Sequence, residues 1–342
     1  MASKPIIRVI GSLNVDFVTL TPRVPGPGET IAAKSMTVHA GGKGANQACA
    51  CGKAAFVSPT EQAVKVEMIG AVGADDPYYA SLLKPTLEKS GVSTRYVEEI
   101  QGVQTGTATI LVDEGSNGEN RILFVPGANY HVNDISKVLA TATEDGEPDV
   151  VVMEGEIPRS ITLELLSTFS SDKRKTCVIF NPAPVFEEGI PLDSLQNLAV
   201  LVVNESECLL LFQTIEELKR IEVPREQDLT ESHLDRLTEH LHTLAGVKII
   251  VVTLGARGVY FSAQTSRARG FVPAAKVNRV VDTTAAGDTF VGYFATALAP
   301  HIASHNALDG FDVRSAVSRA NEAAAKCVQR SGAMESIPFG YE

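Results

Sequence analysis

Long apolar runs are missing from this sequence. Its 342 residues are 44% apolar and 21% charged, as in ordinary globular proteins, but no stretch approaches the roughly 20 apolar residues that cross a membrane. The strand-like residues 6–10 follow residues 1–5 directly, without the apolar core of a signal peptide. We therefore expect a cytoplasmic protein, with nuclear entry left open, built as one large domain or as one domain with a small appendage.

Positive charge and patterned metal ligands are also scarce. The sequence has 30 Lys and Arg residues and 41 Asp and Glu residues. The resulting net charge of −11 argues against nucleic acid or an anionic membrane as the main partner. The five cysteines are odd in number and irregularly spaced, as in reduced cytosolic proteins, and the seven histidines form no ligand motif. Cys49 and Cys51 point to different faces if they lie on a helix. We expect no transition-metal site.

What the sequence does contain is the run Asp282-Thr-Thr-Ala-Ala-Gly-Asp288, which leads into a helical pattern. The small residues Ala285, Ala286 and Gly287 would leave the first amides of a helix bare, and such amides bind phosphate oxygens. Placing a carboxylate beside an anion site is electrostatically unfavourable, so a carboxylate in this position is expected to have a chemical role. We therefore expect Asp288 to accept a proton from a hydroxyl that attacks the phosphate. The alternative is that Asp288 only caps the helix.

Asn14 and Asp16 form a second polar feature. In an extended strand these alternate residues share one face, opposite Leu13, Val15 and Phe17. A carboxylate accepts two hydrogen bonds from neighbouring hydroxyls, which suits the diol of a sugar. The alternative is an exposed edge strand with its polar residues turned outward.

A glycine-rich loop, Gly41-Gly42-Lys43-Gly44, precedes an Ala-rich helical pattern over residues 45–55. Its glycines permit close approach of the backbone to a ligand. The loop is not a Walker A motif, because Thr37 stands where the first glycine belongs and Gly44 follows the lysine. The alternative is a loop that merely turns the chain.

The strand pattern predicts two sheets. Residues 15–40 and the alternating stretches 105–112 and 121–125, joined by a polar turn over 113–118, are expected to form one small antiparallel sheet. From about residue 133, apolar strands alternate with helices, which predicts a parallel sheet covered on both sides. The strands expected in the large sheet are 6–11, 66–73, 149–154, 176–181, 200–204 and 248–254.

Polar residues gather where the strands of the large sheet end. The carboxyl ends of parallel strands form the ligand-binding edge of an open sheet, so this gathering favours an active site. Asn204 and Glu207 lie three apart at the start of a helix and could hold a hydrated divalent cation against phosphates. The alternative is that Glu207 interacts only with the helix dipole.

Two further helices are expected, over residues 77–90 and 309–329. The second is expected to end with Gly332 in a left-handed conformation. The mixed-charge region 212–233 predicts a solvated helix and loop without chemistry of its own.

The chain resembles the ribokinase and PfkB family of sugar kinases. The motifs that carry the resemblance occur in family order and span nearly the whole chain: residues 11–16, 41–47, 181–184, 204–207, 253–258 and 282–290. The resemblance implies a single ribokinase-like α/β/α domain over residues 1–342, with a mostly parallel central sheet. It also implies a small antiparallel β-sheet lid, formed by about residues 14–40 and 105–125, and a homodimer joined through the lids.

The resemblance implies ATP-dependent phosphorylation of D-ribose at O5, which gives D-ribose 5-phosphate and ADP. By similarity, Asp288 is the base that deprotonates the 5-hydroxyl beside the anion hole of Ala285, Ala286 and Gly287. The residues implied to bind ribose are Asn14, Asp16, Gly42, Lys43, Asn46, Glu156 and Asp288. ATP is implied to lie across Asn204, Thr253, Leu254, Gly255, Ala256, Arg257, Gly258, Gly287 and Asn321.

The resemblance also implies two cations. One is Mg²⁺, held by Glu207 mostly through water, and the other is K⁺, a monovalent activator near the anion hole. The implied K⁺ ligands are Asp282, Thr284, Cys327, Arg330, Gly332 and Ser336, several of them through backbone carbonyls. A cation there would explain why an acid opens the motif.

The chain is longer than the family pattern over residues 56–65 and 212–233, and neither insertion touches a motif. Alternative functions are a related kinase for deoxyribose, fructose or a nucleoside, since Asp288 and the anion hole serve any primary hydroxyl. A catalytically silent sugar sensor is a further alternative. The presence of Gly287 and Glu207 together with Asp288 argues against it.

Overall fold

The computed structural model describes residues 3–116 and 119–342. Its largest sheet has nine strands in the order β15-β14-β13-β12-β11-β10-β1-β6-β7. All strands from β13 to β7 run parallel, as predicted, and β14 and β15 add antiparallel strands at one edge. The strands are β1 (Ile6–Ile10), β6 (Lys65–Gly73), β7 (Val92–Ile100), β10 (Val150–Met153), β11 (Cys177–Phe180), β12 (Val200–Asn204), β13 (Ile249–Thr253), β14 (Val259–Ala263) and β15 (Arg269–Val272).

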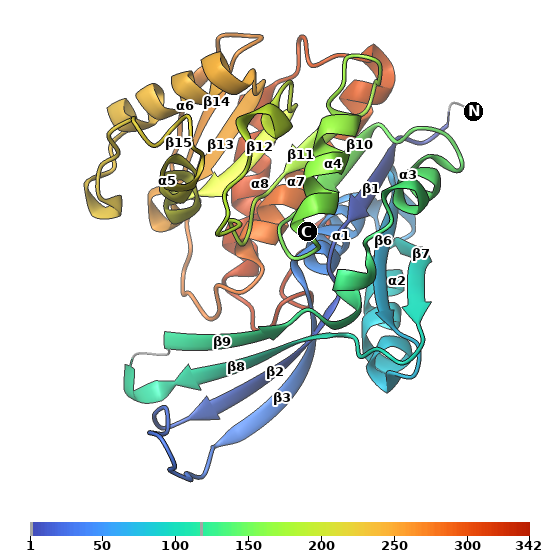
Figure 1. Ribbon diagram of the computed structural model, residues 1–342, viewed down its shortest axis with the longest axis vertical. Coiled ribbons are helices and arrows are strands. Elements are labelled where there is room, and N and C mark those ends of the chain that lie inside the picture. The colour runs from blue at the N-terminus through green and yellow to red at the C-terminus, as the bar shows by residue number, and fades with distance from the viewer. Residues whose placement is uncertain (1–2, 117–118) are drawn as a thin grey trace.

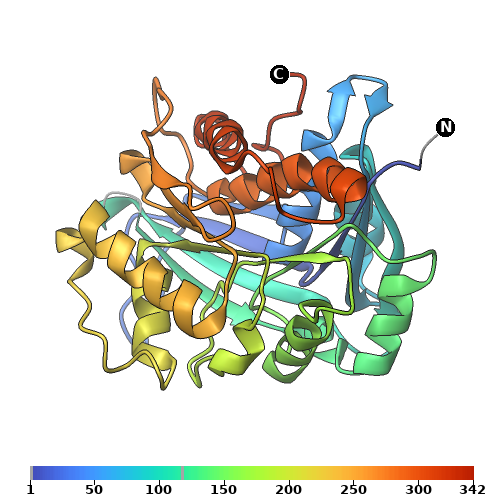
Figure 2. The same cartoon turned by 90° about the horizontal axis from the view of Figure 1, so that it is seen from above.

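Helices cover both faces of this sheet, as Figure 2 shows. On one face lie α1 (Lys43–Ala54), α2 (Lys84–Lys89), α7 (Ala286–His305) and α8 (Val313–Cys327). On the other lie α3 (Ile135–Thr143), α4 (Arg159–Phe169), α5 (Glu205–Thr214) and α6 (Glu231–Ala245). Every residue of β10 and β11 is buried, because helices pack on both of their faces. The predicted three-layer α/β/α class is therefore confirmed.

Four strands form a second, smaller sheet that projects from the large one (Figure 1). In order, these strands are β3 (Ser35–Gly41), β2 (Asn14–Thr21), β8 (Gly106–Asp113) and β9 (Glu119–Val125). The pairs β2/β3 and β8/β9 are antiparallel, as predicted. The central pair β2/β8 is parallel, because both strands leave the large domain in the same direction. The edge-strand alternative for Asn14 and Asp16 is wrong, since β2 has a neighbour on each side.

Several element boundaries differ from the predictions. The helix expected over 77–90 is a π-helical turn, Tyr79–Leu83, followed by α2. The last helix starts only at Val313, where the Asp312 side chain accepts a hydrogen bond from the Ser315 amide. Gly332 has a positive φ of 93° but lies beyond the end of α8, so it does not close that helix. Of the turn expected over 113–118, residues 117 and 118 lie outside the described part.

The first insertion lies at the amino end of β6, and the second reaches the turn after β13, where the Leu229 carbonyl accepts a hydrogen bond from Arg257. Residues 56–65 contain a hairpin of β4 (Phe56–Ser58) and β5 (Glu61–Gln62), and the Phe56 ring packs edge-on against Phe339 at 5.6 Å. The region 212–233 holds the end of α5, a loop anchored by buried Leu218 and Leu229, and the start of α6. Among the described helices, none combines the length and apolarity required to cross a bilayer.

Candidate active site

Two cavities of similar size adjoin at the start of α7. The polar cavity, of about 620 Å³, lies between the small sheet and the strand ends of the large sheet. Its polar lining includes Asn14, Asp16, Lys43, Asn46, Glu156, Asn181, Asn204, Glu207 and Asp288. The apolar cavity, of about 610 Å³, is lined by residues that include Ala274, Val277, Val280, Phe290, Asn321, Ala324 and Val328. Both cavities border Thr253, Thr283, Ala286 and Gly287.

The start of α7 presents backbone amides to this junction. Ala285 precedes the helix in a left-handed conformation, with φ 60°, and makes no side-chain cap. The Ala286 amide donates to the Thr283 carbonyl at 3.3 Å, whereas that of Gly287 has no backbone acceptor in the described part of the chain. A Cβ on Gly287 would meet no atom within 4 Å, so this residue borders open space. Such a helix start can bind an anion.

Asp288 is held by amide side chains from α1. Asn46 Nδ2 donates to Asp288 Oδ2 and Gln47 Nε2 donates to Oδ1, each at 3.0 Å. The Asp288 side chain is buried apart from the surface that borders the polar cavity. The capping alternative is wrong, because the carboxylate contacts another helix rather than the amides of its own.

Asn14 and Asp16 both face the polar cavity from β2. Asn14 Oδ1 accepts from Asn129 Nδ2 at 2.7 Å, and Asn14 Nδ2 donates to Glu156 Oε2 at 3.2 Å. The Asp16 carboxylate lies against Gly41, where any side chain would overlap it. Burial, together with the charges of Glu156 and Asp288, raises the pKa of Asp16 to about 7. Asp16 therefore titrates near neutral pH when no ligand is bound.

Two glutamates follow β10 and bind the turn after β1. Glu156 Oε2 accepts from Ser12 Oγ at 2.6 Å and from the Lys43 amide at 3.1 Å. Glu154 lies deeper, where it accepts from the amides of Ser12 and Glu156. Burial and the charge of Glu156 raise the pKa of Glu154 well above its usual range. The pKa of Glu156 is raised as well, chiefly by burial.

Lys43 supplies the positive charge among these acids. Burial disfavours its ammonium, but the charges of Asp288, Glu156 and Glu207 outweigh burial and raise the pKa of Lys43. The neighbouring Gly42 has φ 88°, and a Cβ there would lie 2.7 Å from the Asn14 amide. The glycine-rich loop thus packs directly on β2 and begins α1 at the cavity wall, rather than merely turning the chain.

The residues implied to bind ATP lie in different places: most line the apolar cavity, one lies on the polar cavity, and two line neither. Thr253, Gly255, Ala256, Gly258, Gly287 and Asn321 line the apolar cavity. Asn321 Nδ2 donates to the Pro273 carbonyl at 2.8 Å. Leu254 is buried, and the Arg257 side chain pairs with Glu205 and donates to the Leu229 carbonyl. These two side chains do not line the cavity. Asn204 lies on the polar side instead.

Asn204 and Glu207 form a capping box at the start of α5. The Asn204 amide donates to Glu207 Oε2 at 2.9 Å, and the Glu207 amide donates to Asn204 Oδ1 at 2.7 Å. Glu207 also borders the polar cavity, and burial raises its pKa. Its environment is therefore more than the helix dipole.

The segments implied to bind a monovalent cation lie side by side. Asp282 accepts from the amides of Thr284, at 2.9 Å, and Gly332, at 3.1 Å. Cys327 Sγ lies 3.6 Å from the Thr284 carbonyl and 3.0 Å from Ser336 Oγ. The Arg330 side chain is directed to Glu342. Within residues 3–116 and 119–342, no three acidic, Cys or His side chains gather as a metal cluster.

Several residues that hydrogen-bond to the groups of the site were not predicted to have a role in it. They are Ser12, Gln47, Asn129, Glu154 and Asn181. Glu154 and Asn181 could have been found from their positions at strand ends. Gln47 could have been found as the neighbour of Asn46. Asn129 carries no local signal, because its contacts to Leu13 and Asn14 span more than a hundred residues.

Comparison with known proteins gives consistent results. The pfkB family carbohydrate kinase model matches residues 5–339. The ribokinase of Schizosaccharomyces pombe is 35% identical, over 97% of this chain and 94% of its own. The structure of Thermotoga maritima ribokinase is 33% identical, covers 99% of this chain and 97% of its own, and has a TM-score of 0.76. Arabidopsis thaliana ribokinase, solved with ribose and ATP, is 28% identical over 99% of this chain and 97% of its own, with a TM-score of 0.77.

Proposed function

The chain belongs to the pfkB family of carbohydrate kinases, and from this premise we propose that it is an ATP-dependent kinase of D-ribose. It transfers the γ-phosphoryl group of ATP to O5 of the sugar, and the products are D-ribose 5-phosphate and ADP. The observation that carries the proposal is the junction of two cavities at Ala286 and Gly287, with Asp288 on the polar side. A phosphoryl group passing between the two ligands would cross the start of α7, where the Gly287 amide borders open space.

The sugar occupies the polar cavity in this proposal. Asp16 and Glu156 accept hydrogen bonds from ribose hydroxyls, and Asn14, Asn46 and Lys43 donate to ribose oxygens. Gly42 borders the same cavity, and its lack of a side chain lets the loop pack directly on Leu13 and Asn14. The small sheet covers the sugar as a lid, because Ala108, Ile110, Ile122 and Phe124 border the same cavity.

The adenine and ribose of ATP occupy the apolar cavity, and the phosphates extend to the start of α7. Asp288 takes the proton of the 5-hydroxyl as O5 attacks the γ-phosphorus and the bond to the ADP oxygen breaks. The amides of the anion hole stabilise charge on the transferred group. Lys43, which is attracted by Asp288 and Glu156, adds a second source of positive charge.

The acids of the polar cavity fit a hydrated divalent cation. Glu207 borders the cavity with one oxygen fixed by the Asn204 amide, which suits a contact through water better than a closed protein cage. We assign Mg²⁺ to this position. When bound, it neutralises phosphate charge during transfer.

A monovalent cation, K⁺, fits the segments around Asp282. Asp282 contacts the Gly332 amide there, and Cys327 connects the Thr284 carbonyl to the buried Ser336 hydroxyl. We expect faster turnover in K⁺ than in Na⁺ or a large organic cation, measured as ADP release at constant ionic strength. Equal rates in all three would remove the cation from the proposal.

The small sheet also offers a surface for a homodimer. Met36, Leu123 and Val125 are 62%, 66% and 56% exposed, and adjacent residues on β9 alternate between this outer face and the cavity. We propose that two lids pair through this face. Leu123→Asp is expected to shift the protein from dimer to monomer in analytical ultracentrifugation. A wild-type protein that sediments as a monomer at micromolar concentration would exclude the dimer.

ADP release over a panel of sugars tests the central proposal. We expect the highest kcat/KM with D-ribose, since the hydrogen-bonding groups of the polar cavity match a polyhydroxylated ring. Higher values for deoxyribose, fructose or a nucleoside would assign the chain to another sugar within the family. No ADP release with any of them, combined with measurable ribose binding, would identify a sugar sensor.

A further inference from the structure

Two amide side chains bind the carboxylate of Asp288, and they differ in what else they can reach. Asn46 borders the polar cavity, so it can exchange its contact with Asp288 for one with a ligand. Gln47 is fully buried and does not line either cavity. Gln47 therefore cannot touch a substrate, and its hydrogen bond to Asp288 persists when the cavity fills.

Gln47 is itself fixed by the next strand. Its Nε2 donates to Asn181 Oδ1 at 3.1 Å as well as to Asp288 Oδ1 at 3.0 Å, which uses both amide protons. Asn181 Nδ2 donates in turn to the Val202 carbonyl of β12 at 3.0 Å. A chain of hydrogen bonds thus connects α7, α1 and the ends of β11 and β12. We call Gln47 and Asn181 the amide relay.

The other end of the Gln47 amide shows that its donors matter. Within the described part of the chain, Gln47 Oε1 is buried without a hydrogen-bond partner. A buried unsatisfied carbonyl costs free energy, and an apolar side chain of the same length would avoid that cost. The two hydrogen bonds that its nitrogen donates offset this cost.

We propose that Gln47 is a positioning residue for phosphoryl transfer, which holds Asp288 through the amide relay in the orientation that faces the attacking hydroxyl. This inference rests on the proposed function, since it assigns the reacting group to Asp288. Its physical basis is that a rotated carboxylate loses alignment with the hydroxyl proton. Misplacement of a reacting group by about 1 Å lowers turnover on the order of 10²-fold.

Gln47→Met tests the inference, because methionine has a similar length and no donor. We expect kcat with ribose to fall by about 10- to 100-fold, while the ribose Kd measured by calorimetry without ATP stays near the wild-type value. Asn46→Ala is the matched comparison on the same carboxylate. It should weaken ribose binding as well as turnover, because Asn46 reaches the cavity.

Asn181→Ala tests the same relay from its other end. It should lower kcat less than Gln47→Met, since Gln47 keeps its bond to Asp288. In the double variant the two losses should be less than additive, because part of the effect of Asn181 passes through Gln47, while the rest reflects the position of Asn181 on the polar cavity. Fully additive losses would contradict the relay.

Three outcomes separate the hypotheses. A wild-type protein without ribose-dependent ADP release defeats the proposed function. An active wild type with an unchanged kcat in Gln47→Met defeats the relay alone, as does a parallel fall of kcat, ribose affinity and melting temperature, which indicates a packing role. If Gln47→Met does not fold, Asn181→Ala decides, and an unchanged kcat in that variant overturns the inference.

Discussion

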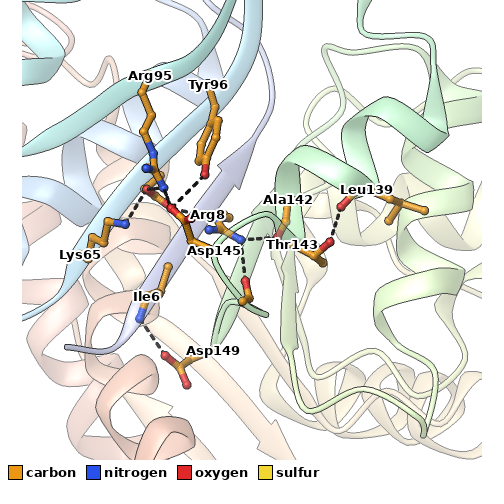
Figure 3. A network of polar contacts seen from close by, with 12 residues as sticks. Ile6, Arg8, Lys65, Arg95, Tyr96, Leu139, Ala142, Thr143, Asp145 and Asp149 are labelled. Atoms are coloured by element: carbon orange, nitrogen blue, oxygen red, sulfur yellow. Dashed lines mark hydrogen bonds and ion pairs between the residues drawn. The ribbon is translucent and has the colours of Figure 1, made fainter. Parts of the chain in front are cut away.

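Two buried charge clusters in this protein have opposite compositions. In the cleft cluster, the four acids Asp16, Glu154, Glu156 and Asp288 surround one cation, Lys43. In the strand cluster, one buried acid, Glu67, meets three cations, and Figure 3 shows these cations, Arg8, Lys65 and Arg95, close together. Glu67 lies 2.8 Å from Arg8 Nε, 2.9 Å from Lys65 Nζ and 2.8 Å from an Arg95 nitrogen. One cluster has too few cations for its acids, and the other has more than enough.

The difference appears in the pKa values. Burial alone would raise the pKa of Glu67, but hydrogen bonds from Lys65 and Arg8 outweigh it and lower that pKa. In the cleft cluster, burial and like charge act in the same direction and raise the pKa of Asp16 and Glu154. The strand cluster pairs its buried acid with cations of the protein itself and supports the fold. In the proposed function, the cleft cluster would be completed by a bound cation and by the hydroxyl donors of the sugar.

The largest expected effect is on the cleft side. Asp288→Asn should lower kcat by about two to four orders of magnitude, because the amide cannot accept the hydroxyl proton. Ribose binding should persist, since asparagine keeps the size and hydrogen-bonding reach of the aspartate. ADP release and calorimetric titration measure the two quantities separately. Turnover close to that of the wild type would reject Asp288 as the base.

The next effect is on the strand side and concerns stability. Arg8 is fully buried and donates to the carbonyls of Ala142 and Gly146 as well as to Glu67. Arg8→Met should lower the free energy of unfolding by about 3–5 kcal/mol, because it leaves buried partners unpaired. Urea denaturation measures the change.

The control for Arg8→Met is the double variant with Glu67→Leu, which removes both charges and should recover part of the loss. Activity of the folded Arg8→Met protein should match the wild type, since the strand cluster borders neither cavity of the candidate active site. A double variant less stable than Arg8→Met would contradict this account.

A pH profile gives a smaller effect in the cleft cluster. The pKa of Asp16 is raised, so its carboxylate is charged above about pH 7 and protonated below it. The charged form accepts a hydrogen bond at each of its two oxygens, whereas the protonated form donates from one of them. We expect kcat/KM for ribose to fall as the pH drops through about 7, by about tenfold per pH unit at the limit. Asp16→Asn should be less active and should lose this limb of the profile. An unchanged limb in that variant would assign it to another group.

The smallest expected effect is on the melting temperature and concerns Asp145, at the exposed edge of the strand cluster. Asp145 pairs with Arg95 at the surface, and that pairing lowers the pKa of Asp145. Asp145→Asn should leave the melting temperature unchanged within error, because solvent screens the pair and Arg95 keeps Glu67 as a partner. A clear drop in melting temperature would show that Asp145 belongs to the buried part of the cluster.

The features that were predicted correctly are those that depend on neighbouring residues in the chain. The run Asp282–Asp288 predicted a bare helix start because small residues and an acid have the same effect wherever they begin a helix. The parallel core strands were predicted because their apolar runs alternate with helical patterns. β7 and β15 were not predicted, since edge strands carry a mixed, half-exposed pattern that resembles loops. β14 was also missed, although it is buried and lies between β13 and β15.

The sequence by itself thus determined the layered α/β fold and the presence of an acid in the first turn of α7. Only the tertiary structure decided which groups surround that acid. Gln47 and Asp288 are 241 residues apart and meet because α1 and α7 pack on the same face of the sheet. Tertiary packing likewise placed Arg8, in an apolar run, against Glu67, and brought enough acids together to raise the pKa of Asp16. Long-range contacts of this kind leave no periodicity in the chain, because they depend on how whole elements pack.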